Sequence, residues 1–167
     1  MQQTWAKKGH TPIIRSATNW KRFSAIGVIT CQPTGARPGL LLRLTAGSVT
    51  KATIVQTLKA LRRHTRGRVL LIWDGLPTHR AKVVQEYIAS QKQWLRVARL
   101  PAYAPELNPV EYLWSAGKKK ALANVCPNGI AELAARFRRH TTGWRRNTKV
   151  LTGFLKASGL FKDELSS

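Results

Sequence analysis

Apolar residues recur along this chain with two different spacings, and each spacing predicts a different kind of element. Residues 23–30 and 40–44 have the composition of β-strands. The Pro and Gly residues between them predict a turn, and hence a hairpin over 21–46. Residues 69–73 (Val-Leu-Leu-Ile-Trp) form a continuous apolar run, which is typical of a central strand covered on both faces. Residues 94–100 predict one more strand.

A spacing of three to four residues predicts helices in much of the remaining chain. Ile54, Leu58 and Leu61 fall at i, i+4 and i+7, which predicts a helix over 50–66 that ends at Gly67. Similar apolar faces predict four more helices, over 78–90, over 109–124, through 130–137, and through 150–155 with an end near Gly159. Strands that alternate with helices indicate parallel pairing with right-handed crossovers, and hence an α/β fold.

The charge of the chain indicates which class of partner it binds. Its 167 residues, the length of one domain, contain 29 Lys and Arg against 7 Asp and Glu, a formal net charge of +22. Such a charge opposes compaction unless a polyanion neutralises it, and nucleic acid is the first candidate partner. A membrane surface is disfavoured, because no basic amphipathic helix with an aromatic face and no run of about 20 apolar residues is present. Cys31 and Cys126 are far apart and form no Cys-x-x-Cys motif, which argues against zinc.

Two of the few acids stand where structural elements begin or end. Asp74 follows the apolar run directly, and Glu111 lies in the first turn of a predicted helix, with 36 residues between the two. Carboxylates at strand ends can hold the magnesium ions that cleave phosphodiesters. Two structural alternatives stay open. Asp74 could be a turn residue in Asp-Gly-Leu-Pro, and Asn108 to Glu111 has the spacing of a helix capping box.

Two motifs around these acids resemble those of a known family. Residues 73–79 (Trp-Asp-Gly-Leu-Pro-Thr-His) and 100–114 (Leu-Pro-Ala-Tyr-Ala-Pro-Glu-Leu-Asn-Pro-Val-Glu-Tyr-Leu-Trp) resemble the second and third acid motifs of DDE transposases. The similarity is to the bacterial insertion-sequence branch of the mariner-like superfamily. Residues 4–12 resemble the segment after the first acid motif of that branch, and residues 19–30 resemble its second strand. The resemblance covers about residues 4–125 in collinear order.

The resemblance implies a fold, a chemistry and a set of site residues. The fold would be a ribonuclease-H-like mixed sheet flanked by helices, with residues 1–125 as part of the catalytic domain and 126–167 as its helical extension. The activity would be DNA cleavage and strand transfer with two Mg²⁺ or Mn²⁺ ions. Asp74 and Glu111 would be the second and third catalytic acids and metal ligands. Asn108 would cap the helix of Glu111, and His79 matches a family histidine, with packing at a helix start as an equal alternative.

The chain also departs from the family pattern. The family's first aspartate lies on a central first strand, shortly before the segment that begins here at Thr4, yet residues 1–73 contain no Asp or Glu. We therefore expect that this strand and the DNA-end-recognising helix-turn-helix region are missing. The chain would be an N-terminally truncated transposase, inactive alone, from a decayed element, a mis-assigned start codon or a frameshifted gene. An upstream-encoded fragment and a second copy are candidate partners, in a bacterial cytoplasm near the nucleoid.

Basic residues after Glu111 could line a path for DNA. The alternative is a solvated helix face, which is usual for runs of charge. Two other classes of function compete with the transposase reading: a non-catalytic basic nucleic-acid-binding protein that retains the fold, and a small ribosome-associated protein, which leaves the 100–114 motif unexplained. The candidate DNA-contacting residues are Lys118, Lys119, Lys120, Arg138 and Arg139, with Arg145 and Arg146 further on.

Overall fold

The computed structural model describes residues 23–121 and 130–161 of the chain. Several parts of the sequence predictions lie outside these ranges. They are the family-like segments at 4–12 and 19–22, the end of the third predicted helix at 122–124, and Cys126.

The described strands form two separate pairs. Strands β1 (Phe23–Thr30) and β2 (Gly39–Ala46) make the predicted antiparallel hairpin, in which Phe23 lies opposite Ala46 and Thr30 opposite Gly39. Strands β3 (Val69–Trp73) and β4 (Leu95–Arg99) pair in parallel, as the strand–helix–strand pattern predicted. Within residues 23–121 and 130–161 the two pairs do not join into one sheet. No described strand pairs with both β1 and β3.

The predicted helices are present, with two differences in extent. The predicted helix over 78–90 is divided, because Ala81 has an extended backbone (φ −58°, ψ 138°) between a 3₁₀ turn and an α-helix. The fourth helix continues well past residue 137. The α-helices are α1 (Lys51–His64), α2 (Lys82–Ser90), α3 (Pro109–Ala121), α4 (Ile130–Arg146) and α5 (Thr148–Ser158), and the 3₁₀ turns are η1 (Pro77–Arg80) and η2 (Pro105–Leu107).

Local sequence explains where helices α1 and α5 begin and end. The Thr50 hydroxyl oxygen accepts a hydrogen bond from Thr53 N at 3.2 Å, and Thr65 N donates to Leu61 O at 2.9 Å at the other end of α1. Helix α5 ends at Gly159, which has a left-handed backbone (φ 68°) that glycine adopts without strain. None of the described helices is long and apolar enough to cross a membrane.

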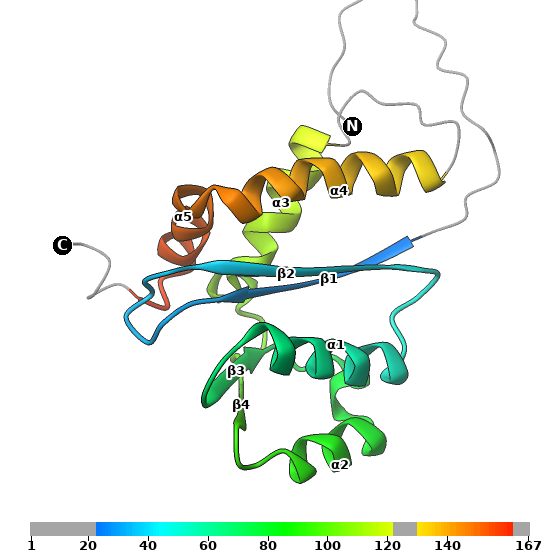
Figure 1. Ribbon diagram of the computed structural model, residues 1–167, viewed down its shortest axis with the longest axis vertical. Coiled ribbons are helices and arrows are strands. Elements are labelled where there is room, and N and C mark those ends of the chain that lie inside the picture. Colours follow the sequence, from blue (N-terminus) through cyan, green and yellow to red (C-terminus); the bar gives the residue numbers. More distant parts are fainter. Residues whose placement is uncertain (1–22, 122–129, 162–167) are drawn as a thin grey trace, which may run out of the picture.

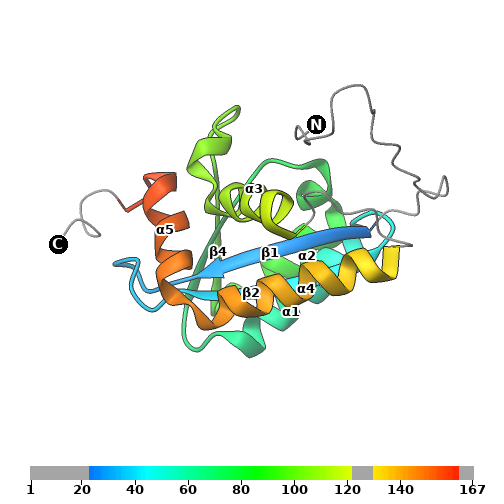
Figure 2. The ribbon, with the colours of Figure 1, turned by 90° about the horizontal axis from the view of Figure 1, so that it is seen from above.

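The hairpin lies between two groups of elements, each with its own core (Figure 1). On one side, α1, α2, β3 and β4 enclose buried Leu58, Leu61 and Leu95. On the other side, α3, α4 and α5 enclose buried Leu113, Trp144 and Leu151 together with Leu40 of β2. Figure 1 shows α4 on one side of the hairpin and α1 on the other, and Figure 2 shows the same hairpin from above, with α4 running along β2. Successive hairpin residues point to opposite faces, so this strand pair contributes to both cores.

One prediction about β3 is wrong for the described part of the chain. Leu71 is buried on the α1 side, but Leu70 is 63% exposed and Ile72 40% exposed, so β3 is not covered on both faces. These two side chains alternate with Leu71 and therefore share the opposite face. Both side chains line the cavity that extends between β3 and β1.

Candidate active site

Asp74 lies immediately after β3, at the carboxyl end of the strand. Its Oδ1 accepts a hydrogen bond from Leu76 N at 3.2 Å, which is the local turn that Asp-Gly-Leu-Pro favours. The same oxygen lies 3.0 Å from Nδ1 of His79. The second carboxylate oxygen, Oδ2, has no hydrogen-bond partner among the described residues, and the side chain is 43% exposed. Asp74 is therefore a turn residue whose Oδ1 makes these contacts and whose Oδ2 makes none with the described residues.

His79 connects Asp74 to the core of the molecule. Its ring stacks on Trp73, with ring centroids 4.2 Å apart and an interplanar angle of 2°. Its Nδ1 also lies 3.2 Å from the Asp74 carbonyl oxygen, and its own carbonyl accepts from Gln85 Nε2 at 2.7 Å. His79 thus packs on Trp73 and contacts Asp74 at the same time, and its role in a site stays a prediction. The ring restricts the orientation of Asp74.

Glu111 lies exposed in the first turn of α3, and Asn108 precedes that helix. Asn108 Oδ1 accepts from Val110 N at 3.1 Å, so Asn108 caps α3 as expected. A full capping box would also direct the Glu111 carboxylate to Asn108 N, but that N–H donates to Pro105 O at 3.0 Å instead. The capping alternative for Glu111 is therefore wrong, because its carboxylate does not accept a hydrogen bond from Asn108 N.

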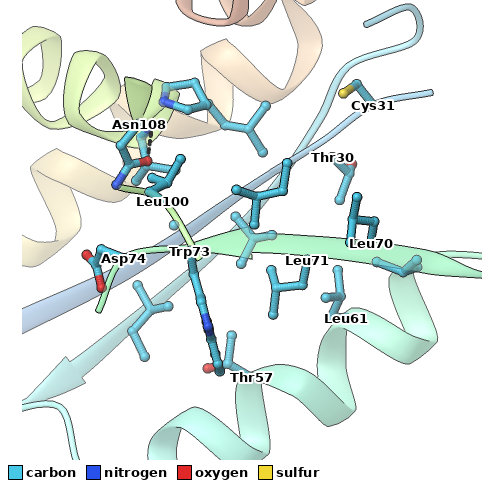
Figure 3. Close-up of a pocket in the computed structure, with 18 of the residues that line it drawn as sticks. Thr30, Cys31, Thr57, Leu61, Leu70, Leu71, Trp73, Asp74, Leu100 and Asn108 are labelled. Atoms are coloured by element: carbon cyan, nitrogen blue, oxygen red, sulfur yellow. Dashed lines mark hydrogen bonds between the residues drawn. The ribbon is translucent and has the colours of Figure 1, made fainter. Parts of the chain in front are cut away.

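Asp74 and Glu111 line the same cavity, together with Asn108 and His79. The cavity has a volume of about 620 Å³ and extends between β1 and β3. Figure 3 shows Asp74 at one end of it, near Asn108, and Leu70 and Thr30 towards the other end. The two acids come from different cores, Asp74 from the end of β3 and Glu111 from α3.

The donor atoms suit a hard divalent cation, although the set is incomplete. Carboxylate oxygens are the ligands that Mg²⁺ and Mn²⁺ prefer, and Mg²⁺ keeps several of its waters, so two protein carboxylates can contribute to such a site. Among the described residues, however, no three His, Cys, Asp or Glu side chains are grouped closely enough to hold a metal ion. The chemistry of the two carboxylates fits such an ion, and Asp74 and Glu111 are the residues that would hold it.

The candidate DNA-contacting residues lie on α3 and α4. Lys118, Lys119 and Lys120 are exposed in the last turns of α3, and Arg138 and Arg139 are exposed on α4. The two helices approach closely at Gly117, where an added Cβ would lie 2.6 Å from the Phe137 ring. Their basic residues therefore belong to one packed pair of helices. Arg145 and Arg146 are exposed near the end of α4.

Sequence reasoning missed the two features that connect these residues. The stacking of His79 on Trp73 had a local signal, since a bend after the strand brings a residue six positions later back over the strand end. The cavity had no such signal in the spacing of residues. Trp73 packs against the core of the strand pair β3–β4, and Trp114 against the core of the helices α3 to α5.

Solved structures identify the fold. The chain is similar to Mos1 mariner transposase in its strand transfer complex (18% identity, TM-score 0.65), with 99% of this chain and 49% of that chain covered. It is also similar to the Mos1 catalytic domain (16% identity, TM-score 0.54; 86% and 78% covered), and to that domain with raltegravir and Mg (18%, 0.56; 84% and 79%). The fold is therefore the ribonuclease-H-like α/β fold of that catalytic domain. The chain spans about half the length of the whole Mos1 chain.

The family follows from the sequence itself. The profile of the DDE superfamily endonucleases matches residues 1–133. That match covers most of the chain, and the chain belongs to this family. No curated protein matches the chain.

Proposed function

We propose that this chain is part of the catalytic domain of a mariner-like DDE transposase of the bacterial insertion-sequence type. In this proposal Asp74 and Glu111 are metal ligands that take part in cutting and joining DNA. The observation that carries it is that two acids from separate cores line one cavity, in a chain with only 7 acidic residues. The family match supports the same reaction class.

Each site residue has a role that its contacts support. Asp74 would offer Oδ2 to a Mg²⁺ or Mn²⁺ ion, because Oδ1 is held by Leu76 N and faces His79. Glu111 would approach from α3, whose first turn Asn108 fixes. A bound metal pair would activate the attacking hydroxyl and stabilise the leaving oxygen. His79 and Asn108 would be positioning residues, since they act through Asp74 and α3.

Residues 1–167 would not cut DNA by themselves in this proposal. Two-metal cleavage needs more ligands than two carboxylates, and residues 1–73 contain no acid that could be the third. The third carboxylate would come from an additional polypeptide segment, such as an upstream-encoded N-terminal transposase fragment. Assembly of two copies around DNA belongs to the same proposal.

DNA would be the partner of the basic surface. The structures of the similar Mos1 transposase include a paired-end complex with the left transposon end. In this chain Lys118 to Lys120 and Arg138 and Arg139 would contact phosphates, which position DNA without reading its sequence. Residues 126–167 would be a helical extension of the catalytic domain, a view that the packing of Trp144 and Leu151 against Leu113 supports.

Manganese binding is the direct test of the two acids. Titration of the purified full chain with Mn²⁺, followed by electron paramagnetic resonance, should show weak saturable binding. Asp74→Asn and Glu111→Gln should each weaken it by about tenfold or more. Glu86→Gln, an exposed acid on α2 away from the cavity, is the matched control and should change nothing.

The same experiment separates this proposal from its alternative. A non-catalytic nucleic-acid-binding protein that retains the fold is favoured by the net charge of +22 and by the absence of a three-ligand group among residues 23–121 and 130–161. Equal Mn²⁺ binding in the wild type, both cavity variants and Glu86→Gln would favour that alternative. DNA affinity is expected under both and does not decide between them.

A further inference from the structure

Tyr103 has a backbone conformation and an exposure that the fold does not require. It lies in the loop between β4 and η2 with φ 58°, in the left-handed region that costs a bulky side chain free energy. Its relative exposure is 102%, as in an extended peptide, so the ring packs against none of the described residues. Gly or Asn would adopt this backbone at a lower cost. Neither packing nor the turn therefore explains a tyrosine at this position.

The loop that carries Tyr103 is held at both ends beside the candidate site. At its start, Leu100 N donates to Trp73 O at 2.8 Å, at the strand end that bears the first acid. At its end, Asn108 caps the helix that bears the second acid. Leu100 and Asn108 both line the cavity that the two acids share. Because an extended chain advances at most about 3.6 Å per residue, the Cα atom of Tyr103 lies within about 11 Å of that of Leu100.

The composition of this loop suits a nucleobase better than a phosphate. Residues 100–108 contain no Lys or Arg, and they contain one acid, the exposed Glu106, which repels a phosphate. An exposed aromatic ring, in contrast, stacks on the flat face of a base, whichever base it is. Pro101 and Pro105 flank Tyr103 and restrict the backbone of the loop. Covering the ring therefore costs little conformational entropy.

Only some bases of a DNA molecule offer a free face to such a ring. Within a continuous duplex both faces of a base are covered by its neighbours, whereas an unpaired base is accessible. We propose that Tyr103 stacks on an unpaired base of DNA, within about four nucleotides of the phosphate that Asp74 and Glu111 would hold. That span is the reach of the loop divided by the spacing of about 3.4 Å between nucleotides along a strand. The chain would therefore prefer DNA with unpaired bases beside the reacting phosphate.

Two DNA probes with the same number of phosphates isolate the contribution of the bases. Each probe is a fluorescein-labelled duplex with a short single-stranded 3′ extension, and the extension carries bases in one probe and abasic sugars in the other. Anisotropy with the purified full chain, in EDTA, gives the Kd for each probe. The wild-type chain should bind the probe with bases about tenfold more tightly. The inference rests on the proposed function, but this measurement involves no metal and no cleavage.

Three protein variants make the test specific to the ring of Tyr103. Tyr103→Asn removes the ring but keeps a residue that tolerates the left-handed backbone, whereas Tyr103→Trp retains an aromatic ring. Val83→Asn is the control, because Val83 is an apolar residue of α2 that is 42% exposed and lies outside this loop. Tyr103→Asn should bind both probes with equal affinity, while Tyr103→Trp and Val83→Asn keep the preference of about tenfold. The urea midpoint of Tyr103→Asn should not fall below that of the wild type.

A fluorescent base supplies a second measurement that does not depend on a variant. 2-Aminopurine in the extension should lose fluorescence when the wild-type chain binds, because stacking on an aromatic ring quenches it. Unchanged fluorescence on binding would overturn the proposal.

The outcomes distinguish this inference from the proposed function. Equal affinity of the wild type for both probes, or a preference that survives in Tyr103→Asn, would overturn the role of Tyr103. An equal loss on both probes in Tyr103→Asn would overturn it as well, because the ring would then contact no base of the extension. Tyr103→Asn should bind Mn²⁺ like the wild type, so a failure of the metal site at Asp74 and Glu111 would appear only in the Mn²⁺ titration.

Discussion

The two carboxylates of the candidate site stand on two halves of the molecule that are built differently. The strand half, residues 51–100, carries Asp74 at the end of β3 and combines two helices with a parallel strand pair. The helical half, residues 109–121 and 130–158, carries Glu111 and consists of three helices around Leu113 and Leu151. The β1–β2 hairpin lies between them and contributes to both cores (Figure 1).

Each acid is positioned by contacts within its own half of the molecule. Within the strand half, His79 and the Asp74 turn fix the acid against its own strand. Within the helical half, Asn108 and a fully buried Leu113 fix the first turns of α3. No direct bond between the halves sets Asp74 against Glu111 in the described residues. Their relative position depends on the hairpin, which packs against both halves.

The largest effect should come from truncating one residue in each core. Leu61→Ala in the strand half and Leu113→Ala in the helical half should each lower the free energy of unfolding by about 2–5 kcal/mol, because both side chains are fully buried. Since the hairpin serves both cores, we expect one cooperative transition in urea, monitored by tryptophan fluorescence and circular dichroism. If each substitution shifted only one of two separate transitions, the halves would be independent and the hairpin would not couple them.

A smaller effect should distinguish the basic surfaces of the halves. Replacing Lys118, Lys119 and Lys120 together with Gln should weaken binding to duplex DNA about a hundredfold at 0.15 M salt and reduce the salt slope by about 2–3. Replacing three exposed lysines of the strand half (Lys51, Lys59 and Lys92) should have much less effect. Salt-dependent anisotropy with labelled DNA measures both. If both triple variants lost the same DNA affinity, DNA would bind the two halves of the molecule without preference.

His79 offers a test of how Asp74 is held. His79→Phe retains a ring to stack on Trp73 but removes the Nδ1 contact with Asp74, whereas His79→Ala removes both. We expect His79→Ala to cost about 1–2 kcal/mol of unfolding free energy and His79→Phe less than about half of that. Both should weaken Mn²⁺ binding. If His79→Phe bound Mn²⁺ like the wild type, His79 would be a packing residue only.

The smallest effect concerns Cys31, which lines the cavity at the end of β1. Burial raises the pKa of the Cys31 thiol above its ordinary value of 9.0. A thiol whose pKa is raised by folding stabilises the folded chain fully below pH 9.0, and this contribution is lost as the pH rises through the higher pKa. The loss should be under about 1 kcal/mol, because the residue is only half-buried. Urea unfolding at pH 8 and pH 10.5, with Cys31→Ser as control, measures it. If the free energy of unfolding fell equally between pH 8 and pH 10.5 in the wild type and in Cys31→Ser, the raised pKa of Cys31 would be contradicted.

The amino-acid pattern was sufficient to predict most helices and strands and the candidate chemistry. Short apolar runs predicted the hairpin, β3 and β4, and the 3.6-residue period predicted α1 and the helices near Glu111 and Gly159, because such patterns reflect which faces of an element are buried. The motifs around Asp74 and Glu111 indicated the DDE family, which the profile match confirms. Spacing alone could not separate a metal ligand from a turn or a cap at these positions.

The contacts between residues that are distant in the sequence became known only from the tertiary structure. It showed that Asn108 N bonds to Pro105 O rather than to the Glu111 carboxylate, that His79 lies between Trp73 and Asp74, and that Leu70 and Ile72 face an open cavity. These are properties of distant neighbours. A residue's own periodicity reports that it can be buried, but the strand that pairs with its edge and the helix that covers its face are set by segments far away in the chain.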